Sequence, residues 1–289
     1  MKQILSLLIM MTLLCGCTSV SDAPTETTSA LQATVETSSP PPTAQPTEFP
    51  EDTLHGGDII PYLNLDAGAY LRSFDDPETA YYLDYYLHVP ENATENMPLL
   101  VFLHGDGEVG NPDALEYYEP IQIVQKIYDD EFPFIALFPC TRVFSWVDGS
   151  IPETLIHLIE ELQEELKLDE TKIMLAGHSR GAIGVWNMIG FYGDFFSCAV
   201  PISCGTGGNI NLENAAKVPV WAIVGNVGEY ELIYAKEMRK TVEKLREMGG
   251  IAYFQVYEDK THIQTVQAAL NTELFEWMLS WEVKKDELL

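Results

Sequence analysis

The segment Gly177-His178-Ser179-Arg180-Gly181 contains the side chain best suited to nucleophilic chemistry. A Gly-x-Ser-x-Gly motif alone is a weak signal, but this one lies between an apolar run (172–176) and a helical pattern (182–191). A serine at a sharp strand-to-helix turn exposes its hydroxyl above the sheet, and the helix directs its N-terminal dipole at the reacting centre. We therefore predict that Ser179 is a nucleophile. The alternative is an ordinary glycine-rich turn.

A serine hydroxyl attacks only when a neighbouring base takes its proton, and histidine suits this role near neutral pH. His262 is the one histidine downstream of the motif. It lies between the last predicted strand (251–257) and the last predicted helix (265–281), at the same edge of the sheet as Ser179. We predict that His262 is the base rather than a surface histidine.

A carboxylate is expected to hold the tautomer of the histidine and to stabilise its cation. By chain order it belongs just beyond the predicted strand 220–224, in a loop that contains no aspartate. Glu229 is our first choice because it is closer to the strand end, and Glu231 is the alternative acid. Either residue would also be favourable as a solvated carboxylate at a helix N-terminus.

Acyl transfer also needs backbone N–H groups directed at the oxygen that gains charge. We predict one such donor at Arg180, directly after the nucleophile. The second belongs to the glycine-rich loop 104–110, where backbone can approach a ligand closely. Asp106 is the first choice and Gly107 the second. The alternative is that this loop is only a turn.

The elements that must position these residues alternate between two hydrophobic patterns. Buried strands and amphipathic helices in alternation predict an α/β fold, a mostly parallel sheet with helices on both faces. Only a short connection (204–218) precedes the acid loop, which leaves no room for a large lid domain. Strands are predicted at 81–89, 99–103, 134–138, 172–176, 199–203, 220–224 and 251–257, and helices at 120–128, 151–168, 182–191, 230–248 and 265–281.

The N-terminus differs from the rest of the chain. Residues 4–14 form an apolar run after Lys2, too short for a membrane span of about 20 residues, which predicts a signal peptide over 1–17. The run ends in Leu-Cys-Gly-Cys, which resembles a bacterial lipobox with Cys17 as the lipidated residue; an ordinary cleaved signal is the alternative. Residues 18–54 are rich in Ser, Thr and Pro and predict a disordered tether. The catalytic domain is expected at 55–289.

The composition excludes several classes of partner and cofactor. A net charge of −28 repels nucleic acid and anionic lipid surfaces, so we expect membrane contact only through the lipid anchor. No His or Cys spacing suits a metal, and no cofactor is expected. The cysteines beyond the tether, Cys140, Cys198 and Cys204, are expected to be buried thiols, with Cys204 nearest the active site.

Together these residues resemble the α/β-hydrolase superfamily, through Leu103-His104-Gly105-Asp106-Gly107-Glu108, the Ser179 motif and the late His262. Within it they look most like the extracellular esterase and predicted-peptidase branch, which includes polyhydroxybutyrate depolymerases and feruloyl esterases. The resemblance implies an eight-stranded sheet and a two-step acyl-enzyme mechanism. The chain departs from the family in its acid loop, where the family usually shows an aspartate soon after Gly225.

The leading functional hypothesis is therefore a carboxylic ester hydrolase, lipid-anchored outside a bacterial cell. Its expected substrates are acyl or feruloyl esters on extracellular polysaccharides. Trp146 and Tyr192 are candidate substrate contacts, with core packing as the alternative role of each. A serine peptidase acting on short peptides is a second hypothesis. A non-catalytic binding protein on a hydrolase scaffold is a third. The sequence leaves the ester and the oligomeric state open.

Overall fold

The computed structural model describes residues 67–112 and 133–283. The chain divides into two units, Met1–Pro50 and Glu51–Leu289, and every described residue belongs to the second. The predicted signal peptide with Cys17, the whole predicted tether and the helix expected at 120–128 lie outside the described residues.

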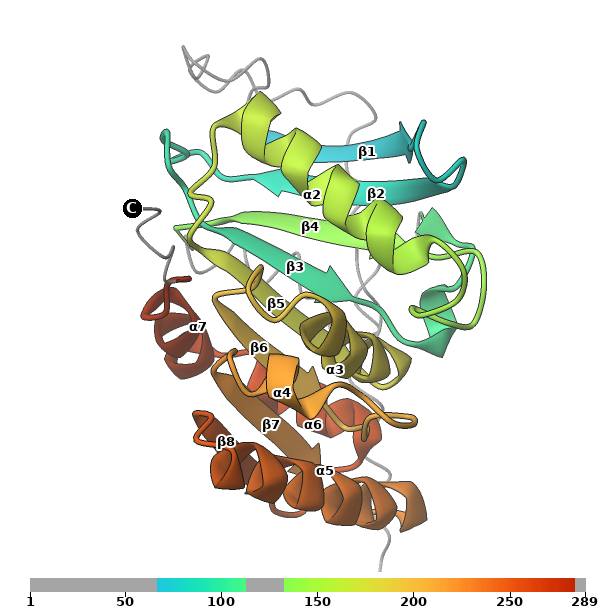
Figure 1. Ribbon diagram of the computed structural model, residues 1–289, viewed down its shortest axis with the longest axis vertical. Helices are drawn as coiled ribbons and strands as arrows, with labels where there is room; N and C mark the ends of the chain where they lie inside the picture. The colour runs from blue at the N-terminus through green and yellow to red at the C-terminus, as the bar shows by residue number, and fades with distance from the viewer. Residues whose placement is uncertain (1–66, 113–132, 284–289) are drawn as a thin grey trace, which may run out of the picture. The chain divides into compact units, whose positions relative to one another are not determined.

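Eight strands form one sheet in this part of the chain, in the order β1-β2-β4-β3-β5-β6-β7-β8 (Figure 1). The first pair is antiparallel, β2 runs antiparallel to β4, and the strands from β3 to β8 run parallel. The strands are β1 Gly68–Asp75, β2 Tyr82–Val89, β3 Leu99–Leu103, β4 Ile135–Cys140, β5 Ile173–His178, β6 Cys198–Ile202, β7 Val220–Gly225 and β8 Ala252–Tyr257.

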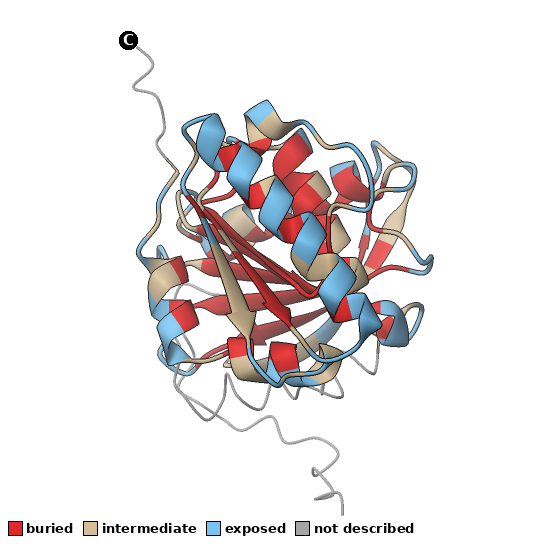
Figure 2. Ribbon diagram, turned by 90° about the horizontal axis from the view of Figure 1, so that it is seen from below, coloured by how far each residue is buried: buried red, intermediate tan, exposed pale blue. Residues whose placement is uncertain are grey.

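Helices cover both faces of this sheet. Leu155, Val185 and Met238 pack α2, α3 and α5 into one hydrophobic cluster, and Val266 and Phe275 pack α6 and α7 into the cluster on the other face. Figure 2 shows the buried strands between helices whose outer faces are exposed. The helices are the short 3-10 turn η1 Asp106–Glu108, then α2 Ile151–Leu166, α3 Arg180–Phe191, α4 Leu212–Ala215, α5 Glu229–Glu247, α6 His262–Ala269 and α7 Thr272–Leu279.

The central strands are apolar because they are covered on both sides. Every residue of β3 and of β6 is buried, as expected for parallel strands between two helical layers. The sheet brings the carboxyl ends of β3, β5 and β7 to one edge, so the loops that follow these strands meet there. Those loops carry the Asp106, Ser179 and Glu231 regions.

Besides the short elements η1 and α4, which were not predicted, a strand and a long helix differ from the sequence-based expectation. The strand β1 was not predicted, because its residues are mostly half-exposed and lack a buried apolar run. The single helix expected over 265–281 is two helices, α6 and α7. Asn271 separates them, and its side-chain oxygen accepts a hydrogen bond of 3.0 Å from the amide of Leu274, which starts a new helix.

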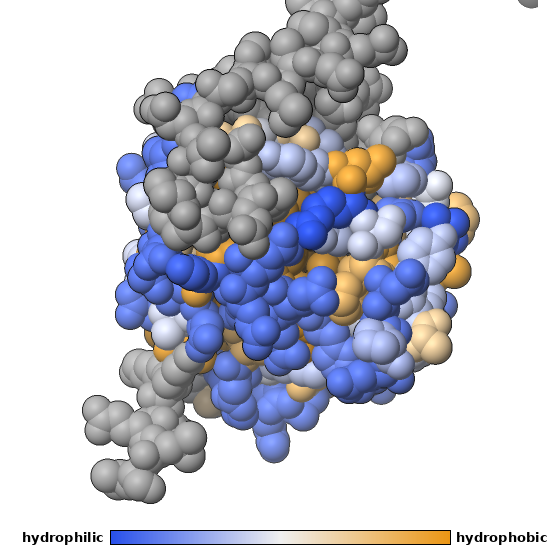
Figure 3. Space-filling model, turned by 90° about the horizontal axis from the view of Figure 1, so that it is seen from above, coloured by the Kyte–Doolittle hydropathy of each residue, from blue (hydrophilic) through white to orange (hydrophobic). Residues whose placement is uncertain are grey.

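The remaining composition-based expectations concern the cysteines and the surface. Cys140, Cys198 and Cys204 are buried and free. None of the helices in residues 67–112 and 133–283 has the length and hydropathy to span a bilayer. On the face drawn in Figure 3, hydrophilic residues predominate among those described, in keeping with the high net charge.

Candidate active site

Ser179 occupies a strained turn between β5 and α3. Its backbone has φ 57° and ψ −119°, a conformation that L-residues rarely adopt and that tends to persist at functional sites. Close packing forces this turn. A side chain at Gly181 would overlap the carbonyl of Leu103, and one at Gly177 would lie 2.7 Å from the backbone of Gly181. The two glycines of the motif therefore let α3 lie against the strands, and the half-buried Ser179 stands at the turn.

His262 and Glu231 form the clearest contact of the site. The Nδ1 atom of His262 lies 2.6 Å from Oε1 of Glu231. A carboxylate only accepts hydrogen bonds, so Nδ1 carries the proton and Nε2 is left as the proton acceptor. Thr261 forms a capping box with Gln264, which fixes His262 as the first residue of α6.

Glu231, and not the preferred Glu229, is the carboxylate that reaches His262. Glu231 is 1% exposed, and its second oxygen accepts hydrogen bonds from Ser203 Oγ at 2.9 Å and from the amide of Gly225 at 2.6 Å. Glu229 is exposed at the first position of α5. Successive side chains on a helix are rotated by about 100° around its axis, so side chains two positions apart point to nearly opposite sides. Distance from the strand end was therefore the wrong criterion, because the direction around α5 decides the contact.

His178 joins the nucleophile strand to the helix of the base. Its ring lies 4.5 Å from that of His262 between centroids, and its Nε2–H donates to the backbone carbonyl of His262 at 3.2 Å. Burial lowers the pKa of His178 to about 3, so this ring is neutral at ordinary pH. His178 therefore positions His262 without adding a charge beside it.

The candidate oxyanion donors come together from two loops. Asp106 begins η1 and Arg180 begins α3, so the N–H of each belongs to a first turn, where intrahelical acceptors are lacking. Their side chains form a two-pronged ion pair, in which Arg180 Nε bonds Oδ1 and Nη2 lies 2.9 Å from Oδ2 of Asp106. An ideal Cβ on Gly105 would lie 3.5 Å from the Cβ of Ser179, which places this loop against the nucleophile. Gly107, the second choice, is the next residue of the same turn.

Buried side chains hold the Asp106 loop in place. His104 accepts a hydrogen bond from the amide of Thr141 at 3.1 Å, and its Nδ1–H donates to the carbonyl of Gly105 at 2.6 Å. Burial lowers the pKa of His104 to about 4 and keeps it neutral. Burial also raises the pKa of Glu108, whose carboxyl group accepts a hydrogen bond from the amide of Gly105. The loop is thus fixed before any substrate binds, as an oxyanion hole requires.

The nucleophile and the base follow strands that end at the same edge of the sheet, and no hydrogen bond joins them in the described part of the chain. Among the residues that the structure describes, none forms a hydrogen bond with the Ser179 hydroxyl. Catalytic hydrogen bonds of unliganded enzymes are often long and shorten when substrate binds.

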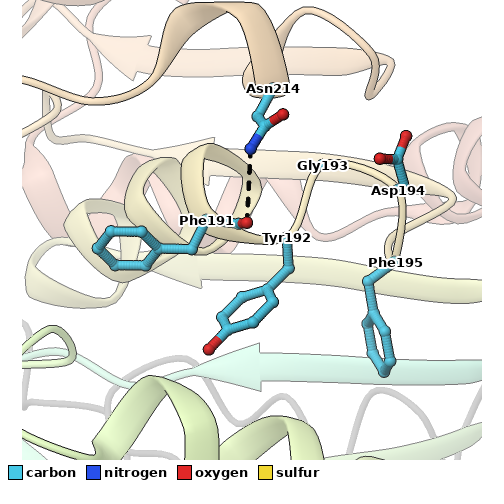
Figure 4. A pocket seen from close by; sticks show the side chains of 6 residues that line it. All are labelled: Phe191, Tyr192, Gly193, Asp194, Phe195 and Asn214. Carbon is cyan, nitrogen blue, oxygen red and sulfur yellow. Dashed lines mark hydrogen bonds between the residues drawn. The ribbon is translucent and has the colours of Figure 1, made fainter.

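Neither aromatic residue proposed as a substrate contact offers a surface to Ser179. Trp146 is 2% exposed, and its indole N–H donates to the carbonyl of His104 at 3.0 Å, so it supports the oxyanion loop. Tyr192 follows the far end of α3, a helix of 12 residues and hence about 18 Å long. There it lines a separate cavity of about 330 Å³ with Phe191 and Phe195 (Figure 4). Trp146 is part of the core, and the half-buried Tyr192 packs against the same hydrophobic cluster.

Several residues of the site were not singled out in the sequence. Ser203 and His178 act on Glu231 and His262 through hydrogen bonds between elements that are distant in sequence. The side chains of Asp106 and Arg180 pair across 74 positions. Only His178 carried a local signal, as a neighbour of the nucleophile. Within the described ranges, no three His, Cys, Asp or Glu side chains are grouped as metal ligands would be.

Comparison with known proteins gives the fold. The chain matches no family model, and no curated protein sequence matches it. A thermostable esterase of known structure is 26% identical with a TM-score of 0.60, over 74% of this chain and 63% of the esterase. This chain therefore spans less than two thirds of that protein.

Two further solved structures cover more of their own length. A ferulic acid esterase is 16% identical with a TM-score of 0.59, over 75% of this chain and 99% of that one. A mutant of the feruloyl esterase module from Clostridium thermocellum, complexed with sinapinate, is 13% identical with a TM-score of 0.57, over 73% and 87%. With its eight-stranded, mostly parallel sheet between helices, this chain has the α/β-hydrolase fold, and these three structural neighbours are esterases of that fold.

Proposed function

We propose that this chain is a serine esterase that cleaves carboxylic esters through an acyl-enzyme intermediate. The observation that carries the proposal is the buried Glu231 held 2.6 Å from His262, at the sheet edge where Ser179 occupies a strained turn. A buried carboxylate directed at a histidine costs stability unless it is well paired, so its placement at the same sheet edge as Ser179 supports a catalytic role.

In the first half of the reaction, Ser179 Oγ attacks the carbonyl carbon of the ester while Nε2 of His262 takes its proton. Glu231 stabilises the imidazolium that forms and keeps the other ring proton on Nδ1. The carbonyl oxygen becomes an oxyanion and accepts hydrogen bonds from the amides of Asp106 and Arg180. Collapse of this intermediate breaks the bond to the alcohol oxygen, which receives the proton from His262.

In the second half, His262 removes a proton from water as the water oxygen attacks the acyl carbon. Collapse of the second intermediate breaks the bond between that carbon and Ser179 Oγ, which takes the proton back from His262, and the acid leaves. The same oxyanion donors serve both steps. Ser203 and Gly225 hold the second oxygen of Glu231 in place through both steps.

The proposed substrates are acyl or feruloyl esters on extracellular polysaccharides. Two of the structural neighbours are named as ferulic acid or feruloyl esterases, which supports this class. The predicted signal peptide, with lipidation at Cys17, supports a domain tethered outside the bacterial membrane, where such polymers occur. Incorporation of labelled palmitate that is lost in Cys17→Ala would test the anchor.

Covalent labelling with a fluorophosphonate probe tests the enzyme directly. We expect labelling of the wild-type protein and none of Ser179→Ala, with Ser145→Ala as a serine control. Hydrolysis of p-nitrophenyl esters but not of aminoacyl-p-nitroanilides would support an esterase, and the reverse preference would support the peptidase hypothesis. A folded protein that neither takes up the probe nor hydrolyses either class would overturn the proposal in favour of a binding protein.

A further inference from the structure

Two stacked tyrosines lie at the start of α5, one exposed and the other half-buried. Tyr230 and Tyr234 are one helical turn apart, with ring centroids 6.3 Å apart and ring planes at 25°. Tyr230 is 71% exposed, which is unusual for an aromatic side chain held in a stack. We refer to Tyr230 and Tyr234 as the tyrosine shelf. Nothing in the proposed reaction so far uses them.

The tyrosine shelf begins beside the reacting groups. The ring of Tyr234 lies 6.1 Å from that of His262 between centroids, and its hydroxyl is directed at the thiol of Cys204, where it lowers the pKa that burial raises. Tyr234 also lies within electrostatic range of Arg180, one of the candidate oxyanion donors. The Cys204 segment is itself fixed, because the indole N–H of Trp186 donates to its carbonyl at 3.2 Å. Tyr234 is therefore a fixed part of the wall next to His262, and Tyr230 extends that wall outward.

The position beside His262 determines which part of an ester meets the shelf. His262 delivers its proton to the alcohol oxygen as the acyl-enzyme forms, so the alcohol must leave from the side of the site on which His262 lies. The acyl group stays on Ser179, against the oxyanion donors. The tyrosine shelf is next to His262, so it lies along the path of the alcohol.

The chemistry of the shelf suits a neutral sugar. A sugar ring presents apolar C–H groups on its face, which stack on an aromatic ring, and hydroxyls at its edge, which can hydrogen-bond phenol groups. The net charge of −28 and the exposed Glu229 next to the shelf disfavour an anionic alcohol such as a uronate. We infer that the tyrosine shelf binds the neutral sugar ring that forms the alcohol part of the substrate. This inference rests on the proposed esterase function.

Three acetates with one acyl group and different alcohols test the inference: methyl acetate, benzyl acetate and a mono-acetylated methyl β-xyloside. The measured quantity is kcat/KM for the xyloside relative to that for methyl acetate. Tyr230→Ala is expected to lower this ratio about two- to tenfold, the range of one aromatic contact, mainly through KM. Tyr230→Phe keeps the ring and should retain most of the ratio. Leu232→Ala, an exposed change on the opposite side of α5, is the matched control.

A fall confined to benzyl acetate would overturn the sugar assignment, and an unchanged ratio for both ring alcohols would overturn the shelf as a binding surface. A separate binding measurement keeps this result distinct from the esterase proposal. Calorimetry of the acetylated xyloside with Ser179→Ala should give a Kd that rises about two- to tenfold when Tyr230→Ala is added. If no acetate is hydrolysed but this difference in Kd is found, the esterase function fails and the sugar site stands.

Discussion

The carboxylate of Glu231 supports His262 from a buried position, with one oxygen on Nδ1 of the imidazole and the other shared by Ser203 and Gly225. Because its two oxygens have different donors, the carboxylate of Glu231 is fixed in place, and so is the imidazole of His262. The carboxylate cannot rotate without losing a hydrogen bond, so the imidazole that it holds is kept in one orientation and one tautomer. Ser203 lies in a positive-φ conformation at 56°, as Ser179 does, so two strained strand ends form the base of the site.

Loss of the Glu231 charge should therefore remove most of the activity. In Glu231→Gln the amide no longer favours a proton on Nδ1 and cannot stabilise the imidazolium, and we expect kcat to fall roughly 10²–10⁴-fold. Glu229→Gln, an exposed change two residues away, should leave kcat within about twofold because surface substitutions rarely matter. Steady-state kinetics on a p-nitrophenyl ester distinguishes the two. Equal losses in both variants would contradict the assignment of Glu231.

The sequence was sufficient where one residue's neighbours along the chain determine its place. Ser179 and the strand before it follow from local apolar pattern and glycine spacing, and the buried strands of the sheet were predicted to within a few residues. The Glu231 contact depends on the direction in which α5 points each of its side chains. That direction requires the first residue of the helix, which the sequence did not fix to within one residue. The pairing of Asp106 with Arg180 depends on the meeting of two loops 74 positions apart, which no local pattern records.

The Asp106–Arg180 ion pair should matter for rate more than for substrate binding. It joins the two residues whose amides we expect to hold the oxyanion, and Arg180 keeps the pKa of Asp106 below its usual range. Asp106→Asn keeps both amides but removes the charge, so we expect kcat to fall roughly tenfold, less than the 10²–10³ typical of losing a donor. KM should change little.

The control for this change is another Asp–Arg ion pair, away from the site. Asp84→Asn removes the partner of Arg142, whose Nη2 lies 2.8 Å from Asp84 Oδ2 on the β2 side of the sheet. It should leave kcat unaffected. A loss in Asp106→Asn that appears only in KM would indicate that the pair binds substrate and does not position the amides.

The strain at Ser179 should be measurable as stability. Glycine adopts φ 57° without steric cost, whereas alanine does not. Sparsely populated backbone conformations cost about 1–3 kcal/mol, and the greater chain entropy of glycine offsets part of this. We expect Ser179→Gly to exceed Ser179→Ala by about 1 kcal/mol in the free energy of unfolding, measured by urea denaturation. At Ser73, in the β1 strand, the order should reverse, since glycine weakens a strand.

The stability of the domain should depend on pH through Asp76 and His157. Asp76 is buried after β1, where it accepts hydrogen bonds from Thr79 Oγ1 at 2.7 Å and from His157 Nδ1 at 2.8 Å. Burial alone would raise the pKa of Asp76, but these bonds and that from the Glu78 amide lower it from 3.8 to about 2. The hydrogen bond to Asp76 raises the pKa of His157 above its ordinary 6.5.

The two shifts define a pH window. The contribution of Asp76 is complete above about pH 4 and is lost as the pH falls towards 2, because the unfolded chain takes up its proton first. The contribution of His157 is complete below about pH 6.5 and is lost as the pH rises through its raised pKa. Asp76→Asn should therefore lower the free energy of unfolding most near pH 5, by about 1–3 kcal/mol for hydrogen bonds to a charged group, and less at pH 3 and pH 9.

Thermal unfolding followed by circular dichroism at these three pH values checks the window. Asp75→Asn is the matched control, since Asp75 is exposed and directly precedes the buried carboxylate. A difference in Tm between wild type and Asp76→Asn that is the same at all three values would show that shape, and not charge, holds α2 against the end of β1. A difference that grows towards pH 3 would contradict the lowered pKa of Asp76, because protonation must erase its advantage over asparagine.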